Sequence, residues 1–358
     1  MEPRARRPLR LLAVTWDGGG NLPPLVGLIE ALVAAGHQVS SLAHRTQSAA
    51  LTAAGARVLG YDRAPERDAG APDPGGYEWL TAFDGAAGED LAAAASQVAP
   101  DVLLIDCMMP ATLEAAAGLG LPVVALVHTA WQTLRDYLGG VFRRPAEAAP
   151  LGLVFSYRKF HTGVAPDNFV WVGPARGHAG ASSWRRRAPG LPLVLASLST
   201  AQQGQAPVLR NLCQALAALD VEALVTVGRA FDPAALPAGG RVSLERSVPH
   251  EHVLGETDLL ITHCGHGTTM AALGFGVPIL CLPGRGDQPA VAARVAGLGL
   301  GEILDTGSSP DAMGAAIIRL LADQAMRDRA RAFALEVGRH PGTNLAVARI
   351  EALAATAG

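Results

Sequence analysis

Apolar positions along the chain follow two alternating patterns. Short apolar runs at residues 11–14, 102–105 and 123–127 have the length of buried strands. Between such runs, apolar residues recur every three or four positions, as in the segment 25–33, whose helical pattern stops at Gly36. This alternation predicts strands joined by helices, and therefore a parallel sheet with helices on both faces.

The same rhythm returns in the second half of the chain. Apolar runs recur at four places, residues 193–196, 224–227, 259–262 and 279–282. The stretch 171–189 before them breaks the pattern with Gly173-Pro174 and three consecutive arginines, which is typical of an interdomain linker. A length of 358 residues also suits two domains better than one.

The fold class predicted from these patterns is α/β, with two doubly wound, Rossmann-like domains. The expected boundaries are a first domain at 1–175, a linker at 176–190, a second domain at 191–340 and a final helix within 341–358.

Composition narrows the classes of function. Net charge is −3, and no Lys/Arg cluster is long enough to predict a nucleic-acid surface. No apolar stretch is long enough to span a bilayer, and the apolar run after the basic start meets Asp17 too early for a signal peptide, so a cytoplasmic location is expected. The four cysteines are widely spaced, which favours buried thiols over a disulfide or metal site.

A glycine-rich turn is the strongest candidate for chemistry. After the apolar run 259–262 come six residues that the helical pattern then follows: His263, Gly265, His266, Gly267, Thr268 and Thr269. The free N–H groups and the dipole of a helix that begins in such a turn favour an anion. Asp287 and Gln288, after the next apolar run, add an acceptor and an amide. Together they suit a ligand with a diphosphate and several hydroxyls, such as a nucleotide sugar.

These residues, with Gly276-Val277-Pro278, Pro283 and Arg294-Val295, resemble the donor-site signature of GT-B glycosyltransferases, and most of all the family-1 enzymes that decorate natural products in actinobacteria. The resemblance implies two domains that face across a cleft and a last helix that packs back toward the first domain. It implies a dTDP- or UDP-sugar donor, a small hydrophobic acceptor held by the first domain and no further cofactor. No DxD-type motif suggests a metal ion.

The resemblance also assigns further donor contacts. Ser199 and Thr200 match a second phosphate loop, and Val248 lies in the segment 247–250, which is similar to the one whose backbone pairs with the pyrimidine of the donor. Two positions depart from the family pattern. Ala271 stands where the family has a ribose-binding Glu, and Val291 stands where an Asn is common.

The catalytic positions depart from the family as well. The family's general-base His falls on Asn21, and its supporting Asp falls on Asp106. A neutral Asn cannot take a proton at pH 7. Three alternatives stay open: Asp106 is the base itself, Asp17 or His128 serves instead, or the acceptor is a phenol, amine or activated carbon that needs little help.

The expected function is inverting, metal-independent glycosyl transfer to a small natural product. Its main rival is a catalytically degenerate homologue that acts as partner or activator of another transferase. A nicotinamide-dependent oxidoreductase would need a GxGxxG turn, which the segment 18–21 does not provide. We expect the acceptor near the segment 64–83, interpreted as a loop that carries Tyr77, Trp79 and Phe83, and the sequence leaves a homodimer open.

Overall fold

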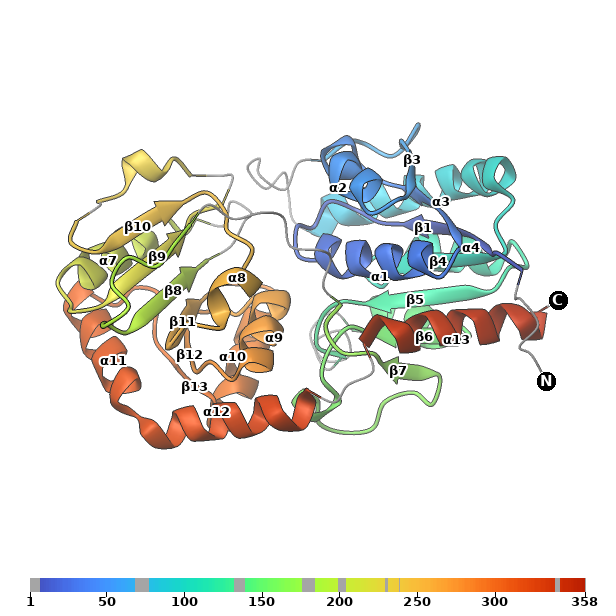
Figure 1. Ribbon diagram of the computed structural model, residues 1–358. Helices are drawn as coiled ribbons and strands as arrows, with labels where there is room; N and C mark the ends of the chain where they lie inside the picture. Colours follow the sequence, from blue (N-terminus) through green and yellow to red (C-terminus); the bar gives the residue numbers. More distant parts are fainter. Residues whose placement is uncertain are drawn as a thin grey trace. The chain divides into compact units, whose positions relative to one another are not determined.

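The computed structural model describes most of the chain and divides it into two compact units (Figure 1). The described residues are 7–67, 77–131, 139–175, 184–198, 204–228, 231–237, 239–338 and 342–357. Unit 1 contains most of residues 1–178 and also 341–358, whereas unit 2 contains 179–340 and the short segment 69–73.

Unit 1 is built on a parallel sheet of seven strands in the order β3-β2-β1-β4-β5-β6-β7. Its strands are β1 (Arg10–Val14), β2 (Gln38–Leu42), β3 (Arg57–Leu59), β4 (Val102–Asp106), β5 (Val123–Val127), β6 (Leu151–Val154) and β7 (Phe169–Trp171). Its α-helices are α1 (Leu22–Ala34), α2 (Ser48–Ala53), α3 (Tyr77–Val98), α4 (Pro110–Ala117), α6 (Gly139–Ala148) and α13 (Gly342–Ala357). Short 3-10 turns are η1 (Arg45–Gln47) and η2 (Arg158–Phe160). The strand order reverses at β1, so the carboxyl ends of β1 and β4 form the edge where doubly wound sheets bind ligands.

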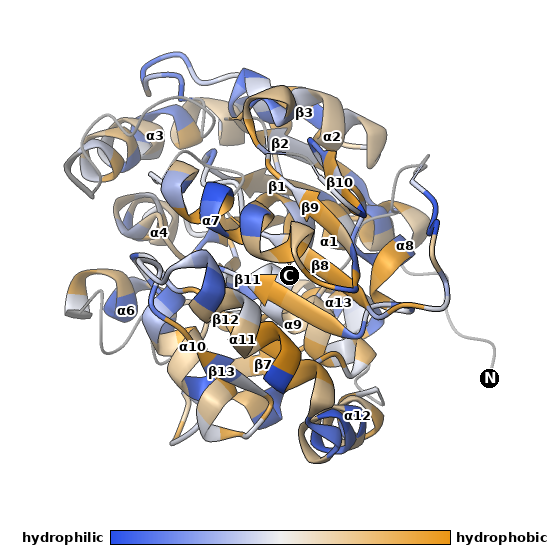
Figure 2. Ribbon diagram, turned by 90° about the vertical axis from the view of Figure 1, so that its left-hand side faces the viewer, coloured by the Kyte–Doolittle hydropathy of each residue, from blue (hydrophilic) through white to orange (hydrophobic). Residues whose placement is uncertain are grey.

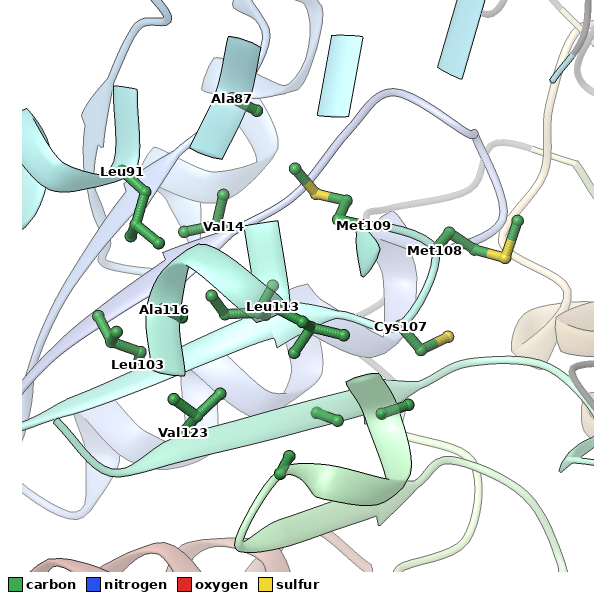
Figure 3. Close-up of a cluster of buried hydrophobic side chains, with 14 of the residues drawn as sticks. Val14, Ala87, Leu91, Leu103, Cys107, Met108, Met109, Leu113, Ala116 and Val123 are labelled. Atoms are coloured by element: carbon green, nitrogen blue, oxygen red, sulfur yellow. The ribbon is translucent and has the colours of Figure 1, made fainter. Parts of the chain in front are cut away.

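Each face of this sheet is covered by helices and carries its own apolar core. On one face α3 and α4 pack on the sheet, and Figure 3 shows Leu91 of α3 and Leu113 of α4 in one cluster with Val14, Leu103 and Val123 of the strands. The other face is covered by α1 and α13, which contact one another.

Helix α13 belongs to unit 1 although the whole of unit 2 precedes it in the chain. Its buried residues Ala346, Val347 and Ile350 join the core that contains Leu28 of α1. An ion-pair contact of 3.3 Å between His37 Nε2 and Glu351 Oε1 lies beside this core.

Unit 2 repeats the plan with six parallel strands in the order β10-β9-β8-β11-β12-β13. They are β8 (Leu193–Ser197), β9 (Glu222–Thr226), β10 (Val242–Glu245), β11 (Leu259–Thr262), β12 (Ile279–Cys281) and β13 (Gly301–Ile303). The helices are α7 (Ala206–Ala217), α8 (Glu251–Leu254), α9 (His266–Phe275), α10 (Gln288–Gly297), α11 (Pro310–Ala322) and α12 (Gln324–Val337), with a 3-10 turn η3 (Pro233–Ala235). Figure 2 shows the central strands as the hydrophobic part of this unit and polar residues on the helices.

The predicted fold class is therefore confirmed, because both units are parallel α/β sheets of the Rossmann type. Among the described helices, none is both long and apolar enough to cross a membrane. One prediction was wrong. The part of the segment 64–83 interpreted as a loop becomes helical at Tyr77, so Trp79 and Phe83 lie on α3; residues 68–76 lie outside the described part.

Candidate active site residues in the two units

The unit 1 site forms where two neighbouring strands end. Asp106 is the last residue of β4, and His128 follows β5 directly. The parallel register pairs Asp106 with Leu126, so the two side chains emerge at the same edge of the sheet. Asn21 reaches this edge from the other side, immediately before α1.

The carboxylate of Asp106 is held by three groups. Its Oδ1 lies 3.0 Å from His128 Nε2 and accepts a hydrogen bond of 2.9 Å from the Met108 N–H. Its Oδ2 accepts a hydrogen bond of 2.8 Å from Asn21 Nδ2. Asp106 is only 3% exposed, so these partners replace water around a buried charge.

The proton on His128 is stabilised by this carboxylate. Burial by itself lowers the pKa of His128, but the contacts with Asp106 and Cys107 outweigh it and raise the pKa of the imidazole well above its usual value. Burial raises the pKa of the Cys107 thiol, so the thiol is neutral at neutral pH and Asp106 supplies the opposite charge. The contact with Asp106 therefore favours the protonated form of His128 in the folded protein.

Cys107 completes a cluster that the sequence analysis did not single out. The ligand atoms of Asp106, Cys107 and His128 lie within 4.8 Å of one another, a set of donors that divalent transition metals accept. In this structure His128 is within hydrogen-bond contact of both the Asp106 carboxylate and the Cys107 thiol. No spacing signal in the sequence links residues 106 and 128, because a strand register brings them together.

A cavity of about 10 Å³ lies beside this cluster and has room for about one water molecule. Its polar walls are Thr15, Asn21, Asp106 and His128, and its apolar walls are Pro24, Leu25, Leu126 and Phe155. The side chain of His128 is 14% exposed, whereas Thr15, Asn21 and Asp106 are all nearly inaccessible. The cavity is thus small and half polar, and His128 is the most exposed of its four polar residues.

Asp17, the other acidic candidate, has a different environment. It is buried, and its Oδ2 accepts a hydrogen bond of 2.7 Å from the hydroxyl of Thr46. It is absent from the described walls of the cavity beside Asp106. The contacts therefore bring Asn21, Asp106 and His128 together and place Asp17 with the loop before α2.

A second hollow, of about 430 Å³, opens next to that loop. Its described walls are Arg45, Thr46, Glu66 and Arg67. The guanidinium of Arg67 lies 4.6 Å from the ring centroid of Trp79 and 5.4 Å from that of Trp16, so aromatic faces support it.

The aromatic residues predicted to face an acceptor have separate roles. Phe83 is fully buried and stacks on Trp79 at 5.1 Å and on His44 at 4.8 Å, so it belongs to the core. Trp79 is half-buried and supports Arg67 beside the second hollow. The side chain of Tyr77 lies outside the described residues. Phe83 was thus wrongly placed by the loop interpretation, because a helix turns it inward.

In unit 2, the glycine-rich turn lies at the carboxyl end of β11, as the sequence predicts. Cys264 takes a left-handed backbone with φ 65°, uncommon for a non-glycine residue, and Gly265 then caps α9. A Cβ at Gly265 would lie 2.5 Å from His263 Nε2, so a glycine is needed for the histidine ring to fold over the turn.

His263, the first of the two histidines in this turn, is neutral. Burial lowers the pKa of His263 to about 4, although a hydrogen bond with the backbone of Ser197 opposes the shift, and the nearby His250 lowers it further. Burial likewise lowers the pKa of His250 to about 4. His263 therefore connects the ends of β8 and β11 and is a hydrogen-bonding group without charge at neutral pH.

The first turn of α9 begins with N–H groups that have no acceptor inside the helix. Its first internal hydrogen bond runs from the Thr269 N–H to the Gly265 carbonyl at 3.0 Å, so the N–H groups of His266, Gly267 and Thr268 have no acceptor inside the helix. The Thr269 hydroxyl donates to the same carbonyl at 3.0 Å and is fully buried. Thr268 is half-buried, and its hydroxyl has no partner among the described residues. Of the two threonines, Thr268 is the one that can still donate to a ligand.

Asp287 and Gln288 begin the next helix, α10. The pKa of the Cys264 thiol is raised by a hydrogen bond with Cys281 and by burial, and the Asp287 carboxylate is close enough to contribute to the same shift. The Oε1 of Gln288 accepts a hydrogen bond of 2.9 Å from the Gly284 N–H, and Gln288 is 5% exposed, so this oxygen braces the loop. The structure therefore brings Asp287 near the glycine-rich turn.

The remaining predicted donor contacts lie in three places, after β8, before α8 and on the helices α9 and α10. Ser199 and Thr200 lie outside the described residues, directly after β8. Val248 is buried in the segment before α8. Val291 is fully buried in α10 and has no polar atom to offer, and Ala271 is half-buried in α9.

Known proteins are similar to this chain in sequence and in fold. Residues 210–353 match the model of "Erythromycin biosynthesis protein CIII-like, C-terminal domain". The chain is 30% identical to the NDP-glycosyltransferase YjiC of Bacillus subtilis over 224 residues, 59% of this chain and 55% of that protein. It is 33% identical to the demethyllactenocin mycarosyltransferase of Streptomyces fradiae over 193 residues, 52% of this chain and 41% of that protein. These matches span about half the length of the curated relatives.

The solved structures extend the similarity to the whole fold. The glycosyltransferase of kitacinnamycin superposes with a TM-score of 0.82 at 27% identity and covers 97% of this chain and 100% of its own. By fold this chain is similar to GT-B glycosyltransferases, and by sequence it is similar to named bacterial glycosyltransferases and, over residues 210–353, to an erythromycin CIII-like C-terminal domain.

Proposed function

We propose that the protein transfers a sugar from a dTDP- or UDP-sugar to a small natural-product acceptor, with inversion at the anomeric carbon and without a metal ion. One observation carries the proposal. The turn from His263 to Thr269 lies at the carboxyl end of β11 and opens a helix whose first N–H groups have no acceptor inside it, in a chain that shares its fold with a glycosyltransferase over 97% of its length.

The chemistry on the donor side follows from where charge grows. As the bond between the anomeric carbon and the diphosphate breaks, negative charge accumulates on the phosphate oxygens. The N–H groups of Gly267 and Thr268 and the Thr268 hydroxyl are donors already fixed at that place. Fixed donors of this kind stabilise a developing anion without reorganisation. This arrangement supports a leaving group neutralised by the protein itself.

The acceptor side of the proposed reaction lies in unit 1. The cavity walled by Asn21, Asp106 and His128 is the polar site of this unit at the carboxyl end of its sheet. The larger hollow beside Arg45 and Arg67 has the volume for the body of an organic molecule. We assign the nucleophile to the cavity and the acceptor skeleton to the hollow.

A second candidate is a partner or activator of another transferase. Two residues favour it: Asn21 in place of the family's base, and Ala271 in place of the ribose-binding Glu. An activator needs the fold and a binding surface but no turnover of its own, so the two functions differ in what the purified protein does alone.

Calorimetric titration with dTDP and with UDP, in buffer free of divalent metal, tests the proposal first. Micromolar binding of one nucleotide supports the donor site and shows whether the donor carries thymine or uracil. The matching nucleotide sugar is then incubated with the protein alone, and release of free nucleotide is followed. Binding with turnover supports the enzyme, binding without any turnover supports the activator, and no binding of either nucleotide contradicts the proposed function.

A further inference from the structure

The amide of Asn21 is fixed in one orientation. Its Nδ2 lies within hydrogen-bond distance of three acceptors, Thr15 Oγ1 at 2.9 Å, the Trp16 carbonyl at 2.8 Å and Asp106 Oδ2 at 2.8 Å. A flipped amide would set its oxygen against a carbonyl and a carboxylate, both of which only accept. The nitrogen therefore faces the protein, and the orientation of Oδ1 is set.

This Oδ1 is a buried acceptor that lacks a donor. Asn21 is 4% exposed, and within the described part of the chain its Oδ1 has no hydrogen-bond partner. Asn21 lines the cavity of about 10 Å³ together with Thr15, Asp106 and His128. A buried polar atom without a partner is costly, so an N–H or O–H from a water or a ligand is needed here.

The neighbouring carboxylate has little capacity left for a second task. Asp106 already binds His128 Nε2 and the Met108 N–H through Oδ1, and Asn21 through Oδ2. A carboxylate offers about four lone-pair sites, so about one remains. For a nucleophile in the cavity, Asn21 Oδ1 is therefore the strong hydrogen-bond acceptor that is still available.

A hydrogen-bond acceptor that cannot take a proton, such as an amide oxygen, discriminates between nucleophiles. An alcohol or phenol has one proton, which it must lose as the new bond forms, and a proton directed at an amide oxygen is not removed. A neutral amine attacks through its lone pair while it keeps an N–H bonded to Asn21. The excess proton leaves only after the new bond has formed.

We propose that the acceptor nucleophile is a neutral nitrogen with at least one N–H, oriented by Asn21 Oδ1, so that the enzyme makes N-glycosides. This inference rests on the proposed glycosyl transfer. The C–N bond forms from the nitrogen lone pair, the bond from the anomeric carbon to oxygen breaks, and its electron pair leaves with the diphosphate. The proton released from nitrogen passes to water.

Matched acceptor pairs test the inference. Aniline is compared with phenol, and aminonaphthalene with naphthol, using the nucleotide sugar of the base that binds in the titration. The expected kcat/KM favours each amine on the order of tenfold or more. Asn21→His supplies a base on this side of the cavity, and we expect it to shift the ratio toward the phenols. Asn21→Leu has similar volume and no Oδ1, and we expect the amine preference to disappear.

The possible results distinguish the assignment of a nitrogen nucleophile from the proposed glycosyl transfer. Transfer confined to the phenols, or an equal rate with both members of a pair, overturns the nitrogen assignment and leaves glycosyl transfer standing. A wild-type ratio that Asn21→Leu does not change also overturns it, because the orientation would then come from elsewhere. Failure of both nucleotide binding and donor turnover overturns the proposed function instead. Melting temperatures of the variants report whether they fold, whereas the ratio of amine to phenol does not depend on how much protein is folded.

Discussion

The imidazole of His128 donates from Nε2 to Oδ1 of Asp106 at 3.0 Å and joins the ends of two adjacent strands, β5 and β4. The family resemblance places a histidine at position 21 instead, on the other side of the same carboxylate. The protein thus has a histidine–aspartate pair, with the histidine supplied by another strand and Asn21 occupying the family's position.

Asp106→Asn is expected to lower turnover about 100-fold or more, the scale of a lost charge-stabilising group. The change removes the charge that holds the proton on His128, whereas nucleotide affinity should stay unchanged because the glycine-rich turn is in unit 2. Steady-state kinetics and calorimetry measure the two quantities. Asp84→Asn is the matched control, since it removes another buried carboxylate of unit 1, one that binds Thr112 and Ala111. Unchanged turnover would remove Asp106 from the chemistry.

The stability of the protein should fall as pH rises through the pKa of His128. The fold raises this pKa above its unfolded value, so the folded state holds the proton more tightly. The stabilisation is complete below about pH 6.5, the unfolded value, and is lost as pH passes the folded pKa. Urea unfolding of wild type and His128→Gln at a series of pH values measures it. The difference in unfolding free energy between the two proteins should shrink toward alkaline pH, and a constant difference would contradict the ion pair.

Gly265→Ala should weaken nucleotide binding by an order of magnitude, roughly 1.4 kcal/mol. The new Cβ would lie 2.5 Å from His263 Nε2 and would displace the ring from the turn. Gly190→Ala is the control, because that exposed glycine has no atom within 4 Å of an added Cβ. Calorimetry should separate the two variants, and equal affinities would show that the position of the His263 ring does not matter for the donor.

Removal of metal ions should leave turnover unchanged. The atoms of Asp106, Cys107 and His128 are bonded to one another, and the helix donors of α9 supply the charge stabilisation proposed for the diphosphate. Rates before and after exhaustive treatment with EDTA measure the effect. Inactivation that Zn²⁺ reverses would instead assign an ion to this cluster, and Cys107→Ser should then weaken its binding.

The sequence predicts best the parts of the fold whose signal is local. The long apolar strands and the turn at Gly265 were located from periodicity and residue type alone. The three-residue strands β3, β7 and β13 were missed because each is too short to show a pattern and is only partly buried. The start of α3 was missed because the sequence before Tyr77 is rich in glycine and proline, a composition typical of loops.

The candidate site shows the same division. His263 and Thr268 follow one another in a motif, so their neighbourhood is encoded in sequence order. His128 was one of several alternatives, since only the register between β4 and β5 reveals which side chain meets Asp106. Phe83 shows the reverse error, because composition alone cannot tell an aromatic residue beside a ligand from one stacked on His44 in the core.

Because helix α13 belongs to unit 1 but follows unit 2 in the chain, unit 1 can complete its fold only after unit 2 has been synthesised. Its residues Ala346 and Ile350 complete the core beside α1, yet they are translated after all of unit 2. While the ribosome is still making unit 2, the nascent unit 1 has its sheet but leaves this apolar patch uncovered. A chain stalled before residue 342 should therefore hold a finished second unit and an unfinished first one, exposed to chaperones and proteases until its final helix emerges.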